Sequence, residues 1–119
     1  MEFFNMFRDE TEVETYADGD WVFIEGQPGD VMYVVKSGKV DIVFDDQVLE
    51  TIPAGGILGE MALVGYHTRS ANAVARGDCE LVPINESRFH HLIQNTPGFA
   101  TGVMKVMADR LRDRTFDSA

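Results

Sequence analysis

The amino-acid sequence predicts a mainly β fold with helices at its C-terminal end, of the antiparallel double-stranded β-helix or jelly-roll class. Three observations point to this class. Eleven glycines separate short segments that are rich in β-branched and aromatic residues. These segments follow one another at a spacing of about 8–12 residues, which is typical of β sandwiches and barrels. After residue 84 the spacing of the apolar residues changes to that of an amphipathic helix.

Alternating polar and apolar residues, or short apolar runs, mark each expected strand. The runs end at clusters of Gly, Pro, Asp and Ser, which supply the backbone conformations that tight turns need. Two of these turns are expected at Ser37-Gly38 and at Gly77-Asp78, each joining two separate strands. The expected strands cover residues 12–16, 21–24, 31–35, 39–44, 47–52, 70–76 and 79–84.

Two helices are expected after the last strand, and a weaker pattern allows a short helix near residues 3–7. Asn85 is a suitable N-cap for the first, because its side chain can accept a hydrogen bond from the first turn. The second is expected to begin at Thr96-Pro97, since a first helical turn does not need the N–H group that proline lacks. Arg110 falls on the polar side of this second helix. The apolar stripe is expected to pack on the β roll and comprises Phe99, Val103, Val106, Met107 and Leu111.

The length of 119 residues suits one domain, with the β roll over about residues 11–84 and the helices over about 85–114. No apolar run reaches the roughly 18 residues of a membrane helix, and Glu2 stands where a signal peptide carries basic residues. We therefore expect a cytoplasmic protein without membrane contact. The net charge of −10 disfavours nucleic-acid binding, which depends on Lys and Arg. Cys79 is the only cysteine and is expected to be a buried, inert thiol.

One segment, residues 57–74, combines groups that suit a phosphate and a sugar. A short helix is expected at residues 61–63, and a helix N-terminus offers unpaired N–H groups with a partial positive charge. Gly59 lets a ligand approach the backbone closely. Arg69 adds a permanent cation whose fork matches two phosphate oxygens, and Glu60 is an acceptor for a sugar hydroxyl. The set suits a ligand that carries one phosphate charge beside a free hydroxyl.

This segment resembles the phosphate-binding cassette of cyclic nucleotide-binding domains, the family found in catabolite activator proteins and in regulatory subunits of cAMP-dependent protein kinase. The family pattern Phe-Gly-Glu-x-Ala-Leu, then Pro-Arg-(Ala/Ser/Thr)-Ala, is similar to residues 58–63 and 68–71. A second pattern, within residues 25–40, is also similar, and the resemblance covers about residues 13–112. The similar stretches are Leu58-Gly59-Glu60-Met61-Ala62-Leu63, Thr68-Arg69-Ser70-Ala71, Glu25-Gly26-Gln27-Pro28-Gly29-Asp30, Met32-Tyr33-Val34-Val35 and Ser37-Gly38-Lys39-Val40.

The resemblance implies a role for each matched site residue. Glu60 would accept a hydrogen bond from the ribose 2′-hydroxyl, and Arg69 would pair with the exocyclic oxygens of the cyclic phosphate. Ser70 would add a hydroxyl contact to the phosphate or the base. Backbone N–H groups would point into the site from Gly59, Met61 and Ala62.

Two positions depart from the family pattern. Leu58 replaces the usual Phe, which is a change in packing. Thr68 replaces the Pro before the arginine, and the loss of proline is expected to loosen the loop and weaken or slow the site. Neither departure removes a charge that the ligand needs.

Other interpretations stay open at this point. Glu60 and Arg69 could form a surface ion pair of little energetic value. The fold could also be kept as a protein-interaction module that binds no nucleotide. Some β rolls hold a metal through histidines, but His67 lies in a loop and His90-His91 are adjacent on a helix, so we expect no metal. We find no nucleophile with a paired base and do not expect an enzyme.

The resemblance implies a sensor that binds cAMP or cGMP, with cAMP preferred, and that signals by repacking of its C-terminal helices. A ligand shifts such an equilibrium only by binding one state better than the other. A protein effector and a homodimer are the implied partners. A transcription regulator would need a helix-turn-helix after the long helix, so DNA binding by this chain is not expected. The last helix is expected to form a short lid, because the chain ends at Ala119, and to leave the base with few contacts.

Overall fold

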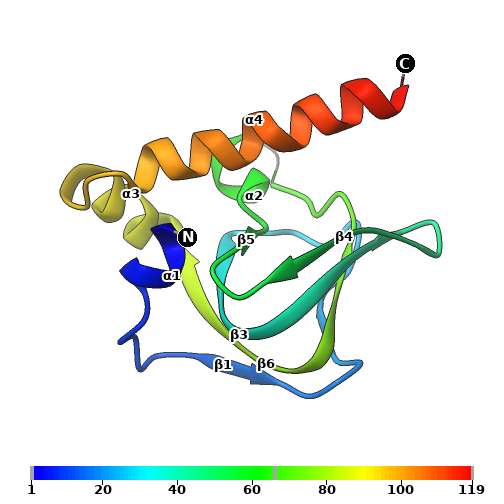
Figure 1. Ribbon diagram of the computed structural model, residues 1–119, viewed down its shortest axis with the longest axis horizontal. Coiled ribbons are helices and arrows are strands. Elements are labelled where there is room, and N and C mark those ends of the chain that lie inside the picture. The colour runs from blue at the N-terminus through cyan, green and yellow to red at the C-terminus, as the bar shows by residue number, and fades with distance from the viewer. Residues whose placement is uncertain (1, 66, 119) are drawn as a thin grey trace.

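The computed structural model describes residues 2–65 and 67–118. The chain folds into a roll of antiparallel strands, with helices at one end and along one side (Figure 1). This confirms the predicted class, although the sheet is open. In chain order the elements are α1 (Glu2–Met6), β1 (Glu14–Tyr16), β2 (Trp21–Phe23), β3 (Val31–Phe44), β4 (Gln47–Pro53), β5 (Ile57–Leu58), α2 (Met61–Val64), β6 (Asn72–Asn85), α3 (Glu86–Asn95) and α4 (Phe99–Ser118).

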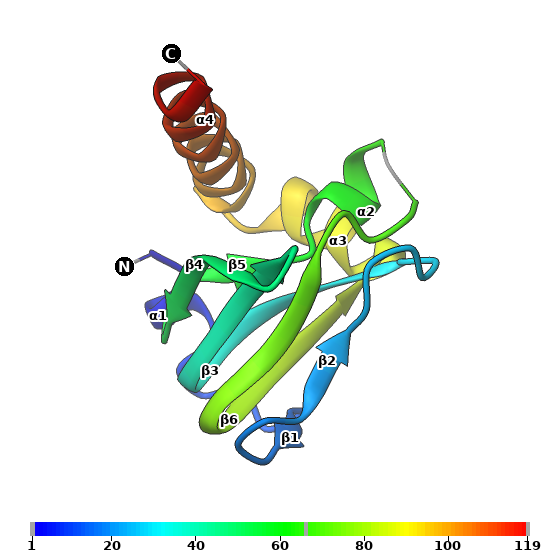
Figure 2. The ribbon, with the colours of Figure 1, turned by 90° about the vertical axis from the view of Figure 1, so that its right-hand side faces the viewer.

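Two long strands form the frame of the roll. β3 and β6 pair antiparallel along nearly their whole length, from Val31 opposite Asn85 to Val43 opposite Asn72. The sheet order is β1-β6-β3-β4, and the short strands β2 and β5 pair with β6 and β3. Every other strand therefore lies beside one of these two, and the long pair curves through the molecule (Figure 2).

The expected turns at Ser37-Gly38 and Gly77-Asp78 are wrong. β3 and β6 run through these positions without a break, and their pairing register shifts there instead. Gly38 has φ +82°, and a Cβ at this position would lie 2.4 Å from the carbonyl oxygen of Asp78. The glycines thus allow the two long strands to pack closely where their pairing is irregular. Since a tight turn needs the same residue types, the local sequence does not distinguish the two structures.

Side chains of β3 alternate between two apolar cores. Met32 and Val34 face a core that is shared with the helices, whereas Tyr33 and Val35 face the core inside the roll. All four residues are buried. Burial on both faces of the strand explains why this stretch of sequence is a nearly continuous apolar run.

Three aromatic rings hold the helices at one end of the sheet. Phe99 of α4 contacts Phe3 of α1 and Phe89 of α3 edge to face, with ring centroids 6.0 and 5.8 Å apart. Asn85 caps α3 as predicted, because its side chain accepts a hydrogen bond from the Arg88 N–H at 2.8 Å. The short N-terminal helix is confirmed as α1.

α4 begins two residues later than predicted. Pro97 and Gly98 form a turn, and Gly98 has φ +86°, which lies outside helical backbone geometry. The helix starts at the fully buried Phe99. The apolar stripe then divides, since Val103 packs in the core while Leu111 is 68% exposed. The stripe therefore docks on the fold through its first half.

Two expectations drawn from the composition can be compared with the structure. Cys79 is buried as predicted, and burial raises the pKa of its thiol. Within the described ranges, we find no helix with the length and apolar character needed to cross a membrane.

Candidate functional site

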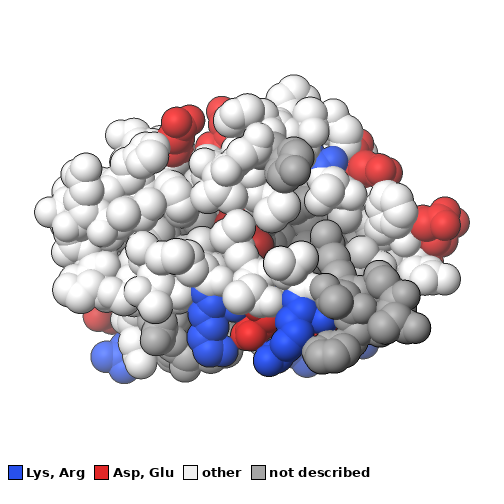
Figure 3. All heavy atoms as spheres, turned by 90° about the horizontal axis from the view of Figure 1, so that it is seen from above, with Lys and Arg blue, Asp and Glu red and all other residues white. Residues whose placement is uncertain are grey.

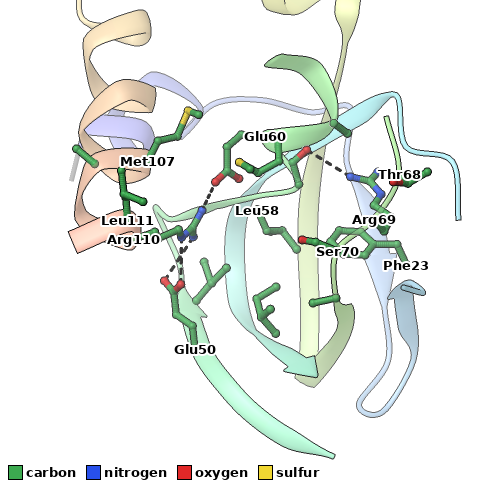
Figure 4. A pocket seen from close by; sticks show the side chains of 17 residues that line it. Phe23, Glu50, Leu58, Glu60, Thr68, Arg69, Ser70, Met107, Arg110 and Leu111 are labelled. Carbon is green, nitrogen blue, oxygen red and sulfur yellow. Dashed lines mark hydrogen bonds and ion pairs between the residues drawn. The ribbon is translucent and has the colours of Figure 1, made fainter. Parts of the chain in front are cut away.

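A cavity of about 350 Å³ lies between the roll and α4, a volume near the lower end of small-molecule sites. Its walls come from both sheet and helices, including β2, β4, α2 and the segment at residues 68–71 (Figure 4). The fold brings together at this cavity all the residues predicted to bind a ligand, and their roles toward that ligand stay predictions. These residues are Gly59, Glu60, Met61, Ala62, Arg69 and Ser70.

Arg69 forms one wall of the cavity as a buried cation. The residue is 8% exposed, and its guanidinium carbon lies 4.2 Å from the centroid of the Phe23 ring. Nη2 donates to the Val31 carbonyl at 2.7 Å, and Nη1 donates to the Gly59 carbonyl at 3.3 Å. Nε is buried without an acceptor in the described part of the chain. Burial lowers the pKa of Arg69, since the charged form loses contact with water.

The loop after β2 fixes the backbone of Arg69. The Arg69 N–H donates to the Gln27 carbonyl, and the Arg69 carbonyl accepts from the Gly26 N–H, both at 2.8 Å. Thr68 pairs with Pro28 in an isolated antiparallel bridge. These hydrogen bonds and the bridge restrain the loop at Thr68, so they oppose the loosening that was expected from the missing proline.

Two glycines leave room for the guanidinium. A Cβ at Gly29 would lie 2.7 Å from Nε of Arg69, and a Cβ at Gly59 would lie 2.7 Å from its Nη1. Gly59 also has φ +76°, a backbone angle that residues with a side chain rarely adopt. Gly59 was predicted for its close approach to a ligand, and the structure shows that it also accommodates the cation.

Glu60 is 3% exposed and pairs with Arg110, not with Arg69. Its Oε1 accepts a hydrogen bond from Nη1 of Arg110 at 2.5 Å. No ion pair between Glu60 and Arg69 occurs among the described residues, so the interpretation as a surface ion pair is wrong. In Figure 4 the Glu60 side chain points toward α4, while Arg69 lies near Phe23 on the other side of the cavity.

α2 is a single short turn between Glu60 and Gly65. The Ala62 N–H donates to the Gly59 carbonyl at 3.2 Å, and the Leu63 N–H donates to the Glu60 carbonyl at 3.0 Å. The Ala62 N–H, which the family resemblance directs toward a ligand, therefore has a partner within the turn. Ser70 is exposed at the cavity wall.

Arg110 is the site residue that the sequence analysis missed. It reaches from α4 to the sheet, where its Nε donates to Oε1 of Glu50 at 3.0 Å and its Nη2 donates to the Ile57 carbonyl at 2.7 Å. Burial acts to lower the pKa of Arg110, but Glu60 and Glu50 outweigh burial and leave this pKa raised. Glu50 and Arg110 are 60 positions apart, so no local pattern joins them. The one sequence feature that could have indicated Arg110 is its position beside the apolar stripe of the helix.

α4 reaches over the cavity. Met107, Ala108 and Leu111 line it together with Arg110. α4 spans 20 residues, or about 30 Å, whereas the expectation that it leaves the base with few contacts stays a prediction. A ligand in the cavity would therefore lie against this helix.

The three histidines do not converge on one place. His67 is exposed, His90 lies 3.8 Å from the carboxylate of Glu86, and His91 contacts the side chain of Asn95. Over residues 2–65 and 67–118, no group of three or more His, Cys, Asp or Glu side chains could hold a metal ion.

The pattern of the cyclic nucleotide-binding domain matches residues 13–96 of this chain. The chain belongs to the cyclic nucleotide-binding domain family. A relative of this domain, the cyclic AMP receptor protein of Thermus thermophilus, is 33% identical over 103 residues. The match covers 82% of this chain and 48% of the relative, so the chain spans about half of that protein's length.

Solved structures share the arrangement of this cyclic nucleotide-binding domain. The catabolite activator protein of Thermus thermophilus superposes with a TM-score of 0.81 at 30% identity, over 98% of this chain and 57% of that one. A protein from a cyclic-GMP-dependent pathway that regulates bacterial phytopathogenesis superposes with a TM-score of 0.75 at 28% identity. The match covers 94% of this chain and 90% of that protein's chain. The family pattern and the structural matches agree on a cyclic nucleotide-binding domain of the regulatory type.

Proposed function

We propose that this domain is a sensor that binds cAMP in the cavity under α4 and carries out no reaction itself. Its similarity to a cyclic AMP receptor protein supports cAMP as the ligand. Its similarity to a protein of a cyclic-GMP-dependent pathway makes cGMP the second candidate. The two ligands share the cyclic phosphate and the ribose 2′-hydroxyl, which are the groups that the cavity suits.

The buried charge of Arg69 is the observation that carries this proposal. Its hydrogen bonds go to two neutral carbonyls, and its Nε has no acceptor in the described part of the chain. A buried charge without a counter-charge is unfavourable, and an anion that accepts hydrogen bonds offsets this cost. The planar guanidinium suits two oxygens of one phosphate group. An anionic ligand at this wall would therefore supply the counter-charge that Arg69 lacks and an acceptor for its Nε.

The charges around the cavity favour an anion with one charge. Two arginines and two carboxylates line it, so their formal charges cancel: Arg69, Arg110, Glu50 and Glu60. Arg110 already has both carboxylates as partners. A cyclic phosphate diester brings one negative charge to Arg69, whereas a phosphate monoester brings about 1.5 to 2 at neutral pH. We expect cyclic nucleotides to bind better than 5′-AMP.

Glu60 supplies the group that would recognise ribose. Arg110 donates to Oε1, and no described residue donates to Oε2. A carboxylate oxygen is an acceptor only, so Oε2 suits a hydroxyl donor such as the ribose 2′-hydroxyl. Ser70 would complete the set with a contact to the phosphate or the base.

The output of the sensor would pass through α4. Because Met107, Ala108, Arg110 and Leu111 line the cavity, a ligand that contacts them binds one position of the helix better than another. A protein effector or a second copy of the chain would read that position. The similarity to part of a global regulator that links cell-cell signalling to virulence gene expression supports, as the alternative, a role as the sensor part of a transcription regulator.

Calorimetric titration of the purified chain, cleared of nucleotide, tests the proposal with cAMP, cGMP and 5′-AMP in parallel. We expect saturable binding of one cyclic nucleotide per chain and much weaker binding of 5′-AMP. Absence of heat and of any thermal shift with all three ligands would overturn the sensor proposal. The domain would then be a protein-interaction module with the same fold.

A further inference from the structure

The outer face of the sheet is the side of β2, β6, β3 and β4 that is turned away from the core inside the roll. Side chains alternate between the two sides of a strand. In β6, Ala73 and Ala75 are buried in that core, so Val74 between them faces outward. Figure 2 looks onto the right-hand side of Figure 1 and shows β2, β6 and β3 side by side, with α2 and α4 above them. This face therefore lies beside the helices and not beneath them.

Four apolar residues are neighbours on the outer face. The register places Trp21 of β2 beside Val74 of β6, and Val43 of β3 beside Val48 of β4. The residue opposite Val74 on β3 is Asp41, two positions before Val43 and on the same side of the strand, so the two apolar pairs adjoin. Trp21 and Val48 are each 55% exposed. We call Trp21, Val43, Val48 and Val74 the outer-face patch.

The exposure of Trp21 is unusual for a residue that serves only the fold. Tryptophan is largely buried on average, and it is enriched at the centres of protein interfaces. Other residues line the cavity, so a ligand there leaves the outer-face patch in contact with water. Adjoining apolar side chains on a surface, rimmed by polar residues, mark a site where another molecule binds.

The charges around the outer-face patch are mainly negative. Figure 3 shows acidic side chains at the right-hand end of the molecule, where Figure 1 places the hairpin between β3 and β4. The charged residues that adjoin the patch are the acids Asp20, Glu25, Asp41, Asp45 and Asp46 and the bases Lys39 and Arg76. Of the two bases, Arg76 already pairs with Asp41 at 3.8 Å. A partner that carries basic residues therefore complements this rim.

The tip of the hairpin holds two aspartates in a backbone conformation that glycine adopts more readily. Asp45 has φ 54° and Asp46 has φ 61°. Both values suit the two-residue turn that closes a tight hairpin, for which Asn-Gly and Asp-Gly are preferred. Two adjacent carboxylates also repel each other. The sequence keeps two negative charges at this end of the outer-face patch against both effects, which supports a role in binding.

We propose that the outer-face patch is a docking surface for a partner protein that presents apolar side chains flanked by lysine or arginine. The partner covers Trp21 and Val48 at the centre, and its basic residues face the acidic rim. This role goes beyond that of a nucleotide sensor, since it needs no ligand in the cavity. A second copy of the chain is a poor occupant, because its own acidic rim would meet this one.

The fluorescence of Trp21 reports directly on the outer-face patch, because it is the only tryptophan of the chain. The probe is a peptide of 7 residues, as long as β4, with the sequence Lys-Lys-Leu-Phe-Leu-Lys-Lys. We expect it to shift the Trp21 emission to shorter wavelength in a saturable way, because it replaces water around the indole. Two control peptides carry glutamate in place of lysine, or serine in place of leucine and phenylalanine. Both should bind at least about tenfold more weakly.

Variants at exposed positions locate the binding. Val48→Ser should weaken binding of the lysine peptide about fivefold. The matched control is Ile93→Ser on α3, where the side chain is also exposed, and it should bind as the wild type does. Asp45→Asn combined with Asp46→Asn removes two charges and keeps the turn, because asparagine tolerates positive φ. This double variant should bind the lysine peptide about two- to tenfold more weakly.

The proposal is overturned if the lysine peptide leaves the Trp21 emission unchanged or if the glutamate peptide binds equally well. Equal binding of the lysine peptide by Val48→Ser and the wild type would also overturn it. A shift of the emission that appears when the chain alone is concentrated would mean that a second copy covers the patch, which likewise contradicts a basic partner.

Discussion

The guanidinium of Arg69 lies over the ring of Phe23, with its carbon 4.2 Å from the ring centroid. The ring and two backbone carbonyls orient the charge, while no described carboxylate pairs with it. A cation on a ring gains roughly 0.5 to 2 kcal/mol, less than a buried charge loses on leaving water. Arg69 is therefore held in place before a ligand arrives, and a phosphate that binds it has little ordering to impose.

Replacing Arg69 by alanine should weaken cyclic nucleotide binding by about 2–5 kcal/mol, the range for removing one partner of a buried charge pair. Calorimetry measures the loss. Because Arg69 also bonds to Val31 and Gly59, Arg69→Lys is the companion variant, which keeps the charge, loses the fork and should bind with intermediate affinity. Arg76→Ala is the control, since that side chain is 62% exposed and pairs loosely with Asp41. Equal affinity of Arg69→Ala and the wild type would remove Arg69 from the site.

Glu60→Gln should reduce the preference for cAMP over 2′-deoxy-cAMP, because an amide accepts the ribose hydrogen bond less strongly than a carboxylate. The loss of total affinity should be smaller than for Arg69→Ala, since the phosphate contact remains. Competition binding with the two ligands gives the ratio of affinities. Glu50→Gln is the matched control, and its ratio should stay at the wild-type value. A Glu60→Gln variant that discriminates as well as the wild type would place the ribose elsewhere.

Features encoded within a short stretch of chain were predictable. Asn85 was recognised as a helix cap because its side-chain acceptor and the Arg88 N–H that donates to it lie within one turn of the chain. Gly59, Glu60 and Arg69 were predicted together because residues 58–63 and 68–71 carry the cassette pattern, and the structure brings them to one cavity. The alternation of polar and apolar residues likewise located most of the strands that flank the cavity.

Features that depend on distant contacts were not predictable. Gly38 and Gly77 indicate turns when each is considered alone, and only the pairing of β3 with β6 shows that two continuous strands pass there. Arg110 looks like an ordinary polar helix residue until Glu50 and Glu60 are seen beside it. β5 has two residues, too few for any periodic pattern.

Gly29→Ala should displace the guanidinium of Arg69, because the new Cβ would lie 2.7 Å from Nε and 3.0 Å from the Cβ of Ala62. Such overpacking costs about 1–3 kcal/mol of stability, and binding should weaken as well since the cation moves. Gly65→Ala is the matched control, because nothing lies within 4 Å of a Cβ there. Thermal denaturation and titration measure the two effects. Normal binding by Gly29→Ala would show that the site tolerates movement of Arg69.

Asn85→Ala should lower the free energy of unfolding by about 1 kcal/mol, because the Arg88 N–H loses its acceptor at the start of α3. Urea denaturation followed by circular dichroism measures the change. Ser87→Ala, at an exposed position one residue into α3, should leave stability nearly unchanged. Nucleotide affinity should not change in either variant, as α3 does not line the cavity. An unchanged midpoint in Asn85→Ala would mean that water replaces the cap at no cost.

The association rate of a cyclic nucleotide should rise with ionic strength. The chain carries a net charge of −10, and the charged residues that line the cavity cancel, so an approaching anion meets a repulsive field. Salt screens that field over about 8 Å at 0.15 M, and screening should speed the encounter. Dissociation should respond much less, because the buried contacts of Arg69 are poorly screened. Stopped-flow measurements from low salt to 0.15 M separate the two rates. An association rate that falls with salt would instead mean that the local field of the arginines outweighs the charge of the whole domain.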